Sequence, residues 1–248
     1  MNKKQKYHAI GLLLFITGIF TTAPIAAEKL VFTAVESAYV QQISAAVLKA
    51  AYAKLGVEFE ISWLPPKRAL QIANSGKSDG EISRIGSIAK KYPNLIQVKI
   101  PVNYIEGMVF KKNKSLTINH WDDLRPLKIG VNRGIIFTVN GTKGMNVQFV
   151  NSFSSLFQML DIERVDVIVS PRVIGLVQIL KQDLKDIIIN EPPLTRLNQY
   201  HYLHKRHSKL AARLESVLKK MKESGEIARI RSTYIQDLNQ GIIHKRSQ

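Results

Sequence analysis

Three arginines stand where predicted strands end or predicted helices begin, at positions that can face one ligand. Arg68 lies in the first turn of a predicted helix, Arg84 follows the segment 79–80, and Arg133 follows a strand predicted at 128–131. A cation in the first helical turn opposes the helix dipole, so Arg68 calls for a compensating anion. Guanidinium groups bind carboxylates and phosphates through paired hydrogen bonds. The three predict a site for an anionic solute, with solvated surface positions or internal ion pairs as the alternative.

Four further residues can complete such a site. Ser170 is predicted as the N-cap of a helix that follows a buried strand, where free backbone N–H groups attract anions. Glu36 follows the first predicted strand, with Tyr39 three residues on, and can receive an ammonium or hydroxyl group. Tyr104 can stack on a ligand ring, whereas the alternation around Trp63 indicates a core position. An ordinary helix cap and a solvated loop acid are the alternatives for Ser170 and Glu36.

Other chemistries find little support in the sequence. The chain has no Cys, which excludes disulfides, thiolate zinc sites, iron–sulfur clusters and Cys nucleophiles. His201, His204 and His207 are three residues apart, a spacing that directs their side chains apart on a strand or a helix. We find no Gly-rich phosphate loop, Gly-x-Ser-x-Gly elbow or zinc-protease motif. We therefore expect no metal, no cofactor and no catalytic residue.

Charge and composition limit the class of protein. The 248 residues include 36 Lys and Arg against 19 Asp and Glu, a net charge of +17, and 45% are hydrophobic. This length and apolar content are those of one or two packed domains, not of a disordered or fibrous chain. The basic residues are interspersed with acids and do not alternate with aromatic residues, so we expect no nucleic-acid partner.

The first 27 residues have the three parts of a secretory signal peptide. Lys3, Lys4 and Lys6 precede an apolar run at 9–20, and small residues close the segment at 23–27. The apolar run is shorter than the roughly 20 residues that a spanning helix needs. We therefore predict cleavage near Ala27 and export to the periplasm.

Strand and helix patterns alternate along the rest of the chain. Apolar strands are predicted at 30–35, 57–63, 80–82, 96–100 and 105–112, and then at 128–131, 147–150, 165–169, 187–189 and 199–204. Helical patterns separate most of them, and the chain ends in two helices divided at Gly225. Such alternation predicts an α/β fold with two mostly parallel sheets flanked by helices, and the polar stretch 113–119 is a plausible crossing between them. Ligands bind at the carboxyl ends of the strands in such sheets.

Several sequence blocks, in this order and spacing, resemble the bacterial extracellular solute-binding proteins of the amino-acid type, the periplasmic components of ABC importers. The blocks are Arg68-Ala69-Leu70, Gly76-Lys77-Ser78-Asp79-Gly80, Tyr92-Pro93-Asn94-Leu95, the segment 107–112, Trp121-Asp122-Asp123-Leu124, Ile129-Gly130-Val131-Asn132-Arg133-Gly134, the segment 164–169 and the segment 225–230. The resemblance implies a two-lobe periplasmic-binding-protein fold, or Venus flytrap, with two crossover strands. Lobe 1 would comprise 28–111 and 203–248, and lobe 2 would comprise 112–202.

The resemblance also implies a function and its partners. The chain would be a monomer that captures a small polar, anionic or amino-acid-like solute and presents it to an ABC transporter permease in the inner membrane. Two departures from the family pattern bear on the solute. Lys90 and Lys91 stand roughly where the family places a carboxylate-binding Arg, and Ser170-Pro171-Arg172 stands where it places an ammonium-binding Asp. An anionic or polar solute fits this chain better than a standard α-amino acid.

Two other functions stay open on the same scaffold. A periplasmic enzyme resembling cyclohexadienyl dehydratases would need an acid or base in the cleft, for which Glu36 is the candidate. A ligand sensor for a membrane signalling partner would use the same cleft as an importer's binding protein. An envelope-associated protein that binds through its basic surface is a third class.

Overall fold

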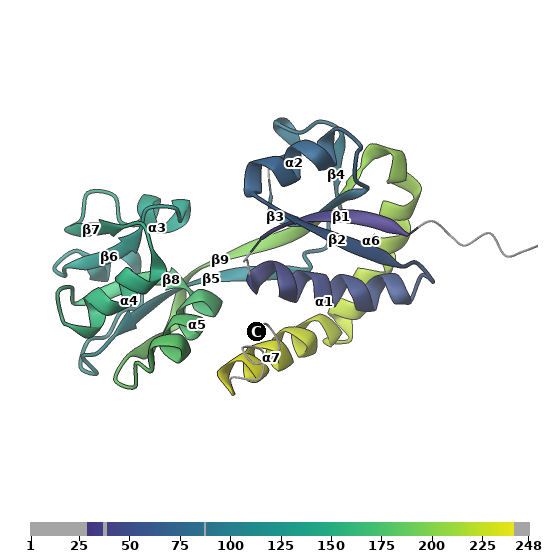
Figure 1. Cartoon of the computed structure of the whole chain (residues 1–248). Coiled ribbons are helices and arrows are strands. Elements are labelled where there is room, and N and C mark those ends of the chain that lie inside the picture. The colour runs from purple at the N-terminus through teal and green to yellow at the C-terminus, as the bar shows by residue number, and fades with distance from the viewer. Residues whose placement is uncertain (1–28, 37–38, 87, 241–248) are drawn as a thin grey trace, which may run out of the picture.

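Two α/β lobes are joined by two long strands in the computed structural model, which describes residues 29–36, 39–86 and 88–240 (Figure 1). The linking strands are β5 (Asn103–Lys111) and β9 (Ile188–His204). The predicted α/β fold with two lobes is confirmed. The predicted signal peptide lies outside the described residues, and none of the described helices has the length and hydropathy of a membrane span.

Lobe 1 is built around the parallel strands at the N-terminal end of the described chain. Its strands are β1 (Leu30–Val35), β2 (Phe59–Leu64), β3 (Gly80–Ile85) and β4 (Leu95–Gln97), and its helices are α1 (Tyr39–Ala53), α2 (Pro66–Asn74), α6 (Ser208–Glu223) and α7 (Glu226–Asn239). The strand β1 pairs in parallel with β2 and with β3. Helices α1 and α6 cover one face of this sheet, around Phe32, Leu48 and Leu214, and α2 covers the other.

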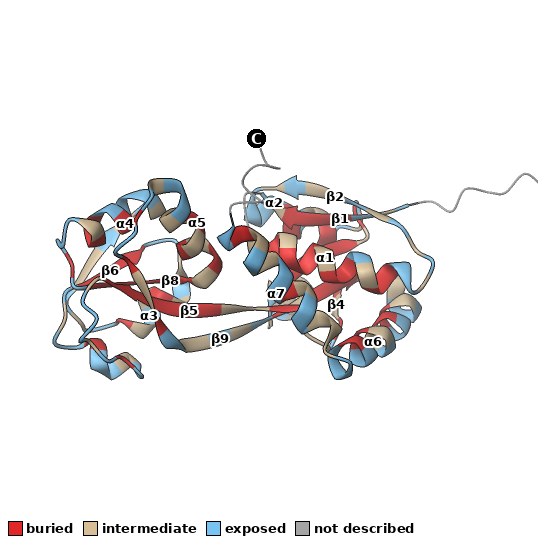
Figure 2. Cartoon of the chain, turned by 90° about the horizontal axis from the view of Figure 1, so that it is seen from below, coloured by how far each residue is buried: buried red, intermediate tan, exposed pale blue. Residues whose placement is uncertain are grey.

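Lobe 2 repeats the plan with fewer residues. Its strands are β6 (Ile129–Asn132), β7 (Val147–Val150) and β8 (Val167–Pro171), and its helices are α3 (Ile136–Gly141), α4 (Phe153–Asp161) and α5 (Arg172–Gln182). The strand β6 pairs in parallel with β7 and β8. Figure 2 shows buried residues concentrated along the strands and on the inner faces of the helices in each lobe, as amphipathic elements require.

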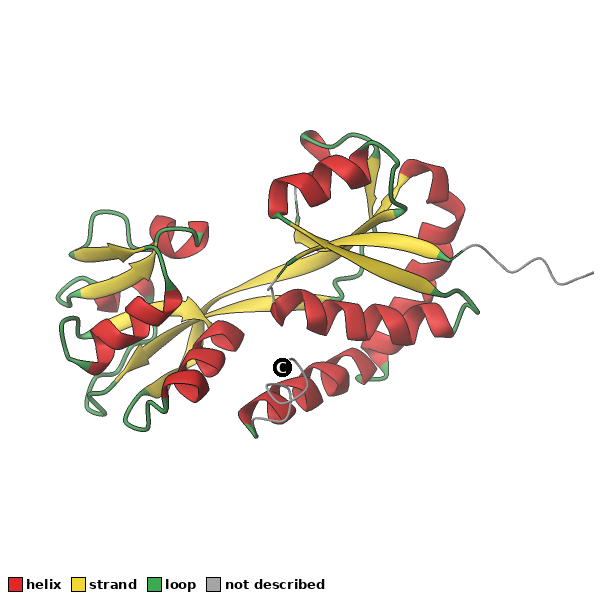
Figure 3. Cartoon of the chain, viewed as in Figure 1, coloured by secondary structure: helices red, strands yellow, loops and turns green. Residues whose placement is uncertain are grey.

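The two crossing strands link the lobes into one hydrogen-bonded sheet of order β2-β1-β3-β9-β5-β8-β6-β7, with β4 paired to β9 (Figure 3). The strand β5 pairs with β9 along its length and with β8 of lobe 2 over Gly107–Lys111, while β9 pairs with β3 of lobe 1. The chain therefore enters lobe 2 along β5, before the polar stretch 113–119 that the sequence suggested. The lobe boundaries at 111 and 203 stay a prediction, since both crossing strands run through both lobes.

The sequence predicts two strands, 187–189 and 199–204, where the structure has the single strand β9. Pro192 and Pro193 lie between the two predicted strands, and proline has no N–H to donate to a strand ladder. They lie between Asn190, which pairs with Val109, and Thr195, which pairs with Gly107. The register shifts between these two pairs, so the prolines lie at an irregularity in the ladder. The strand continues past them although they donate no hydrogen bond.

One glycine permits the close contact between β3 and β9. A Cβ atom on Gly80 would lie 2.1 Å from the carbonyl oxygen of Tyr202 and 3.0 Å from the Cα of Leu203. Both atoms belong to the backbone of the neighbouring strand, so neither can rotate away. The link between lobe 1 and the crossing strand thus requires glycine at this position.

We predict that Gly80→Ala lowers the free energy of unfolding by about 3 kcal/mol, the upper part of the range for overpacking, because the strands must separate. Chemical denaturation followed by circular dichroism measures this. Gly86→Ala is the matched control, since its Cβ would meet only the Tyr200 ring at 3.7 Å. An equal loss of unfolding free energy in Gly80→Ala and Gly86→Ala would show that the close approach of β9 to Gly80 does not limit this position.

Candidate functional site

Three of the predicted site residues lie at one edge of lobe 1. Because β1, β2 and β3 are parallel, their carboxyl ends share an edge. Glu36 follows β1 there and is exposed, with its backbone N–H donating to the Leu64 carbonyl at the end of β2, 3.1 Å away. Arg68 lies exposed in the first turn of α2, and Arg84 lies near the end of β3.

Arg84 is paired inside the lobe, which is the alternative that the sequence left open for it. Its Nε and Nη2 atoms each lie 2.8 Å from Glu81 Oε1, and Nη2 also donates to the Pro66 carbonyl at 3.0 Å. Glu81 is fully buried and also accepts a hydrogen bond from the Thr33 hydroxyl. Burial raises the pKa of Glu81 to about 7, against the opposing effect of the Arg84 charge and the Thr33 hydroxyl.

Arg133 lies at the corresponding edge of lobe 2. It follows β6, is exposed, and places its guanidinium carbon 5.0 Å from the centre of the Phe149 ring on β7. This cation–π contact leaves the hydrogen-bonding edge of the guanidinium available. Arg68 and Arg133 have no ionic partner among the described residues.

Large apolar side chains are exposed on the same edges. Trp63, near the end of β2, is 41% exposed, which corrects the expectation that it is a core residue, because β2 is an outer strand of the sheet. Ile85 ends β3 at 49% exposed, and Ile136 opens α3 at 74% exposed. A solute held between these edges would meet apolar groups as well as cations.

Tyr39 packs against the other lobe. It is the first residue of α1 and joins an apolar cluster with Ile43, with Val173 and Val177 of α5, and with Leu238 of α7. The ring is thus part of the contact by which lobe 1 helices meet a lobe 2 helix. A role for Tyr39 in binding a solute stays a prediction.

Tyr104 has its ring face occupied by protein cations, which corrects the expectation that it is free to stack on a ligand. The guanidinium carbon of Arg231 lies 4.0 Å from its ring centre, and that of Arg196 lies 5.1 Å away. Both cations also pair with Glu106, two residues along β5 and on the same face.

Ser170 is not the predicted helix cap. It is the fourth residue of β8, and the N-cap of α5 is Pro171, without a side-chain hydrogen bond. Pro171 still pairs with Gly107 in the ladder, so the strand runs two residues past its predicted end at 169. Ser170 pairs with Met108 and is fully buried, and its hydroxyl has no partner among the described residues. A contact with a solute would require this part of lobe 2 to open.

The structure reveals an ionic cluster between the lobes that the sequence did not. Glu106 on β5 is 4% exposed and accepts hydrogen bonds from Arg172 of α5 at 2.7 Å, from Arg231 of α7 at 2.8 Å and from Arg196 of β9 at 3.1 Å. Although burial alone would raise it, the pKa of Glu106 is held below its usual value by these cations. The sequence did contain one signal for this cluster, because Glu106 is the single acid inside the apolar strand predicted at 105–112.

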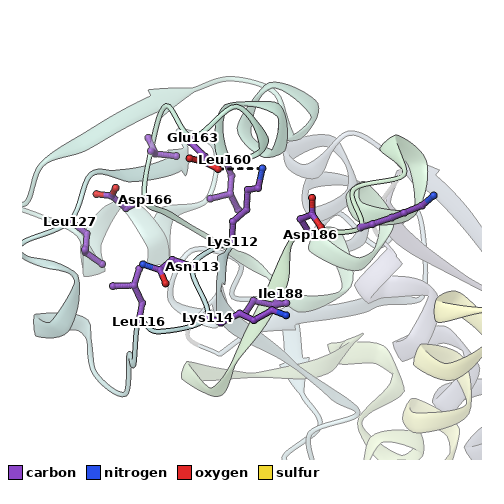
Figure 4. A pocket seen from close by; sticks show the side chains of 12 residues that line it. Lys112, Asn113, Lys114, Leu116, Leu127, Leu160, Glu163, Asp166, Asp186 and Ile188 are labelled. Carbon is purple, nitrogen blue, oxygen red and sulfur yellow. Dashed lines mark ion pairs between the residues drawn. The ribbon is translucent and has the colours of Figure 1, made fainter.

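A pocket of about 770 Å³ lies away from the predicted site, at the far end of lobe 2 (Figure 4). Its lining mixes three lysines with Glu163, Asp166 and Asp186, and Lys112 lies 3.6 Å from both Asp161 and Glu163. Because Asp166 precedes β8, the pocket is at the amino ends of the strands, opposite the edge that carries Arg133. Its charges are largely balanced by one another.

The histidines that the structure describes do not gather as ligands of one metal ion. His201 is fully buried, where its Nε2 atom lies 2.9 Å from the Tyr52 hydroxyl, and burial lowers its pKa to about 4. Among the described residues no three His, Asp or Glu side chains gather as metal ligands. His201 is thus a neutral member of the lobe 1 core.

Comparison with known proteins identifies the sequence family. Residues 35–237 match the family model of the bacterial extracellular solute-binding proteins, family 3. A protein of Shewanella oneidensis described as uncharacterized is 34% identical over 187 residues, which cover 71% of this chain and 69% of the relative. The matched family is one of binding proteins, which supports the expectation of binding without catalysis.

Solved structures share the fold. An amino acid ABC transporter substrate-binding protein from Streptococcus pneumoniae, bound to L-arginine, superposes with a TM-score of 0.60 at 18% identity and covers 85% of this chain and 95% of its own. A histidine kinase sensor domain with similarity to periplasmic binding proteins has a TM-score of 0.61 at 15% identity and covers 84% and 96%. At these identities the likeness concerns the fold.

We predict that Glu106→Gln lowers the free energy of unfolding by about 3 kcal/mol near pH 7, because Arg231 is left without a counter-charge and Arg172 keeps only Glu191. Since the folded-state pKa of Glu106 is lowered, its contribution is present above the unfolded pKa and is lost as the pH falls through the folded pKa. The difference between the wild type and the variant should therefore shrink in acid. Denaturant titrations at several pH values measure it.

Asp122→Asn is the control for that substitution. Asp122 pairs with Arg125 at 2.9 Å, but both side chains are largely exposed, so little effect on stability is expected. A loss in Glu106→Gln no greater than in this control would show that the cluster does not stabilise the fold.

Proposed function

The chain belongs to the bacterial extracellular solute-binding proteins of family 3, and on this premise we propose that it captures a small polar, anionic or amino-acid-like metabolite between its two lobes. In this proposal it works in the periplasm as a monomer and delivers the solute to the permease of an ABC importer in the inner membrane.

The observation that carries the proposal is the pair of exposed cations on the two strand edges. Arg68 stands at the carboxyl edge of lobe 1 and Arg133 at that of lobe 2, and neither has an ionic partner among the described residues. The lobes are linked by β5 and β9, about which such proteins close on a solute. An anion held between the edges would compensate both cations.

The proposed solute carries an apolar part as well as an anionic group. Trp63, Ile85 and Ile136 are exposed on the same edges, and a solute that covers them would gain about 25 cal/mol for each Å² of apolar surface removed from water. Ser170-Pro171-Arg172 stands where the family pattern has an ammonium-binding Asp, so no acid is present in this segment and Arg172 opens α5. That arginine is instead paired with Glu106 and Glu191, at 2.7 Å from each. An ammonium group on the solute therefore has only Glu36 as a proposed partner.

A sensor role is the second candidate, favoured by the fold shared with a histidine kinase sensor domain. The same cleft and solute would serve it, with a membrane signalling protein as the partner in place of a permease. Solute-dependent stimulation of ATP hydrolysis by a reconstituted importer distinguishes the two roles. Stimulation supports transport, and its absence with a solute that binds favours the sensor.

We predict that one chemical class of solute raises the melting temperature of the protein, measured by thermal unfolding after refolding has removed any bound molecule. The panel comprises amino acids, dicarboxylates, aromatic carboxylates, sugar acids and phosphate esters. A solute at 100 times its dissociation constant adds about 2.7 kcal/mol of stability, which corresponds to several degrees in a chain of this length. A panel without any shift would contradict the proposal.

We further predict that Arg68→Ala and Arg133→Ala each weaken binding of that solute by roughly 10- to 100-fold in calorimetric titrations, because each removes a charge-assisted contact. Arg213→Ala in lobe 1 and Arg164→Ala in lobe 2 are matched controls. Both are exposed arginines away from the carboxyl edges, Arg213 on α6 and Arg164 just before β8. Equal losses in the controls would attribute the effect to net charge alone.

A further inference from the structure

A fully buried carboxylate lies beneath the lobe 1 edge. Glu81 is in β3 opposite Thr33 of β1, so both side chains lie on the face of the sheet that α2 covers. The Thr33 hydroxyl lies within hydrogen-bond distance of Glu81 and of the Ala69 carbonyl on α2. A buried carboxylate needs a counter-charge, and in this chain Arg84 supplies it.

Arg84 connects this buried acid to the outside of the lobe. Its side chain is 16% exposed, and its Nε and Nη2 atoms face Glu81 and the Pro66 carbonyl. The remaining amino group, Nη1, has no acceptor among the described residues and is not enclosed by protein. One guanidinium thus binds an internal carboxylate on one side and has free donors on the other, beside the first turn of α2.

No other charged side chain contacts Glu81 within the described chain. From β9, His201 places Nδ1 2.9 Å from the Glu81 carbonyl, but burial lowers the pKa of that ring to about 4, so it is neutral. Tyr202, opposite Glu81 in the ladder, has a pKa raised to about 12 by burial and is neutral as well. The Tyr52 hydroxyl of α1 lies 2.9 Å from His201 Nε2 and does not contact Glu81.

The helices add polar but uncharged contacts. Gln41 of α1 lies beside Glu81 and donates to the Ser83 carbonyl at 2.9 Å. The cations of the first turn of α2, Lys67 and Arg68, are exposed and make no contact with Glu81. The charge of Glu81 is therefore balanced by Arg84 alone.

We propose that Glu81 is an internal counter-ion that competes with the anionic group of the solute for Arg84, so that binding of an anion at the lobe 1 edge is coupled to protonation of Glu81. The inference rests on the proposed function for the site itself. The balance is simple: the anion and one proton from solvent enter, Glu81 becomes a neutral carboxylic acid, and Arg84 stays charged with the anion as its partner.

The direction of the coupling follows from like-charge repulsion. An anion on the outer side of Arg84 lies within several ångströms of the Glu81 carboxylate, with little water between them, and raises its pKa further. Since burial already raises the pKa of Glu81 to about 7, the proton is taken up near neutrality. The complex then holds more protons than the free protein, so affinity for the anion increases as the pH falls through this range.

Calorimetry with two simple anions tests the coupling. Succinate and sulfate represent a carboxylate and an inorganic oxyanion, and each is titrated into the mature protein in buffers of different ionisation enthalpy at several pH values from about 6.5 to 8.5. The wild type should take up roughly half a proton per bound anion near pH 7, and its affinity should fall roughly tenfold towards the alkaline end.

Glu81→Gln should bind the same anion without proton uptake and with an affinity that no longer depends on pH. At the alkaline end it should bind roughly tenfold more tightly than the wild type, because the amide does not repel the anion. Glu58→Gln is the matched control, an exposed acid of lobe 1 whose loss should leave the wild-type pattern unchanged. Arg84→Ala should abolish the pH-dependent component.

Three results would overturn the proposal. They are binding of both anions without proton uptake, weaker binding by Glu81→Gln at every pH, and no binding of either anion. If Glu81→Gln does not fold, carbon NMR of the wild type takes its place, and the Glu81 carboxyl must titrate at a higher pH with anion than without.

A solute that shifts the melting temperature without proton uptake would remove this inference and leave the proposed function. Proton-coupled binding of succinate or sulfate, with no solute in the panel that shifts the melting temperature, would support this inference and contradict the proposed function.

Discussion

The antiparallel ladder between β5 and β9 is the constraint on which the rest of the structure depends. The strand β9 pairs with β3 in lobe 1 and the strand β5 pairs with β8 in lobe 2, so one continuous ladder joins the two lobes. Near the crossing the register shifts beside Gly107, where a side chain would lie 2.6 Å from the Phe137 ring of α3. Contacts of α5 with α1 and α7 support the strands from one side. Both facing edges, and any solute between them, are positioned by this arrangement.

Two buried acids, Glu106 in a crossing strand and Glu81 inside lobe 1, show how the number of neighbouring cations sets the protonation state of a carboxylate. Glu106 has three arginines around it, and its pKa stays below the usual value although burial acts in the opposite direction. Glu81 has one arginine and a hydroxyl, and burial prevails, with a pKa of about 7. The first acid is a fixed charge that joins α5 and α7 at the interface of the lobes. The second is balanced close to neutrality, which makes it responsive to a further charge near Arg84.

Sequence periodicity was sufficient to locate most strands and helices because each of them buries one face locally. The strand at 30–35, the helix with Arg68 in its first turn and the two C-terminal helices divided at Gly225 all appear as predicted. The pairing of side chains could not be obtained in this way. Arg84 and Glu81 are three residues apart, but only the shifted register of β3 brings them into contact. The partners of Glu106 come from β9, α5 and α7, up to 125 residues away, and no local pattern records such distances.

Electrostatics links the fold to the proposed capture of an anion. Arg68 and Arg133 have no ionic partner within the described part of a chain whose net charge is +17, and like charges that approach within the Debye length of about 8 Å repel each other. Closure of the lobes without a solute would bring these cations together, whereas an anion between them turns the repulsion into two attractions. The apolar residues on the same edges favour closure only after the charges are balanced. In this proposal the arginines therefore keep the unliganded lobes apart, and the same residues supply the free energy that holds the lobes together around an anionic solute.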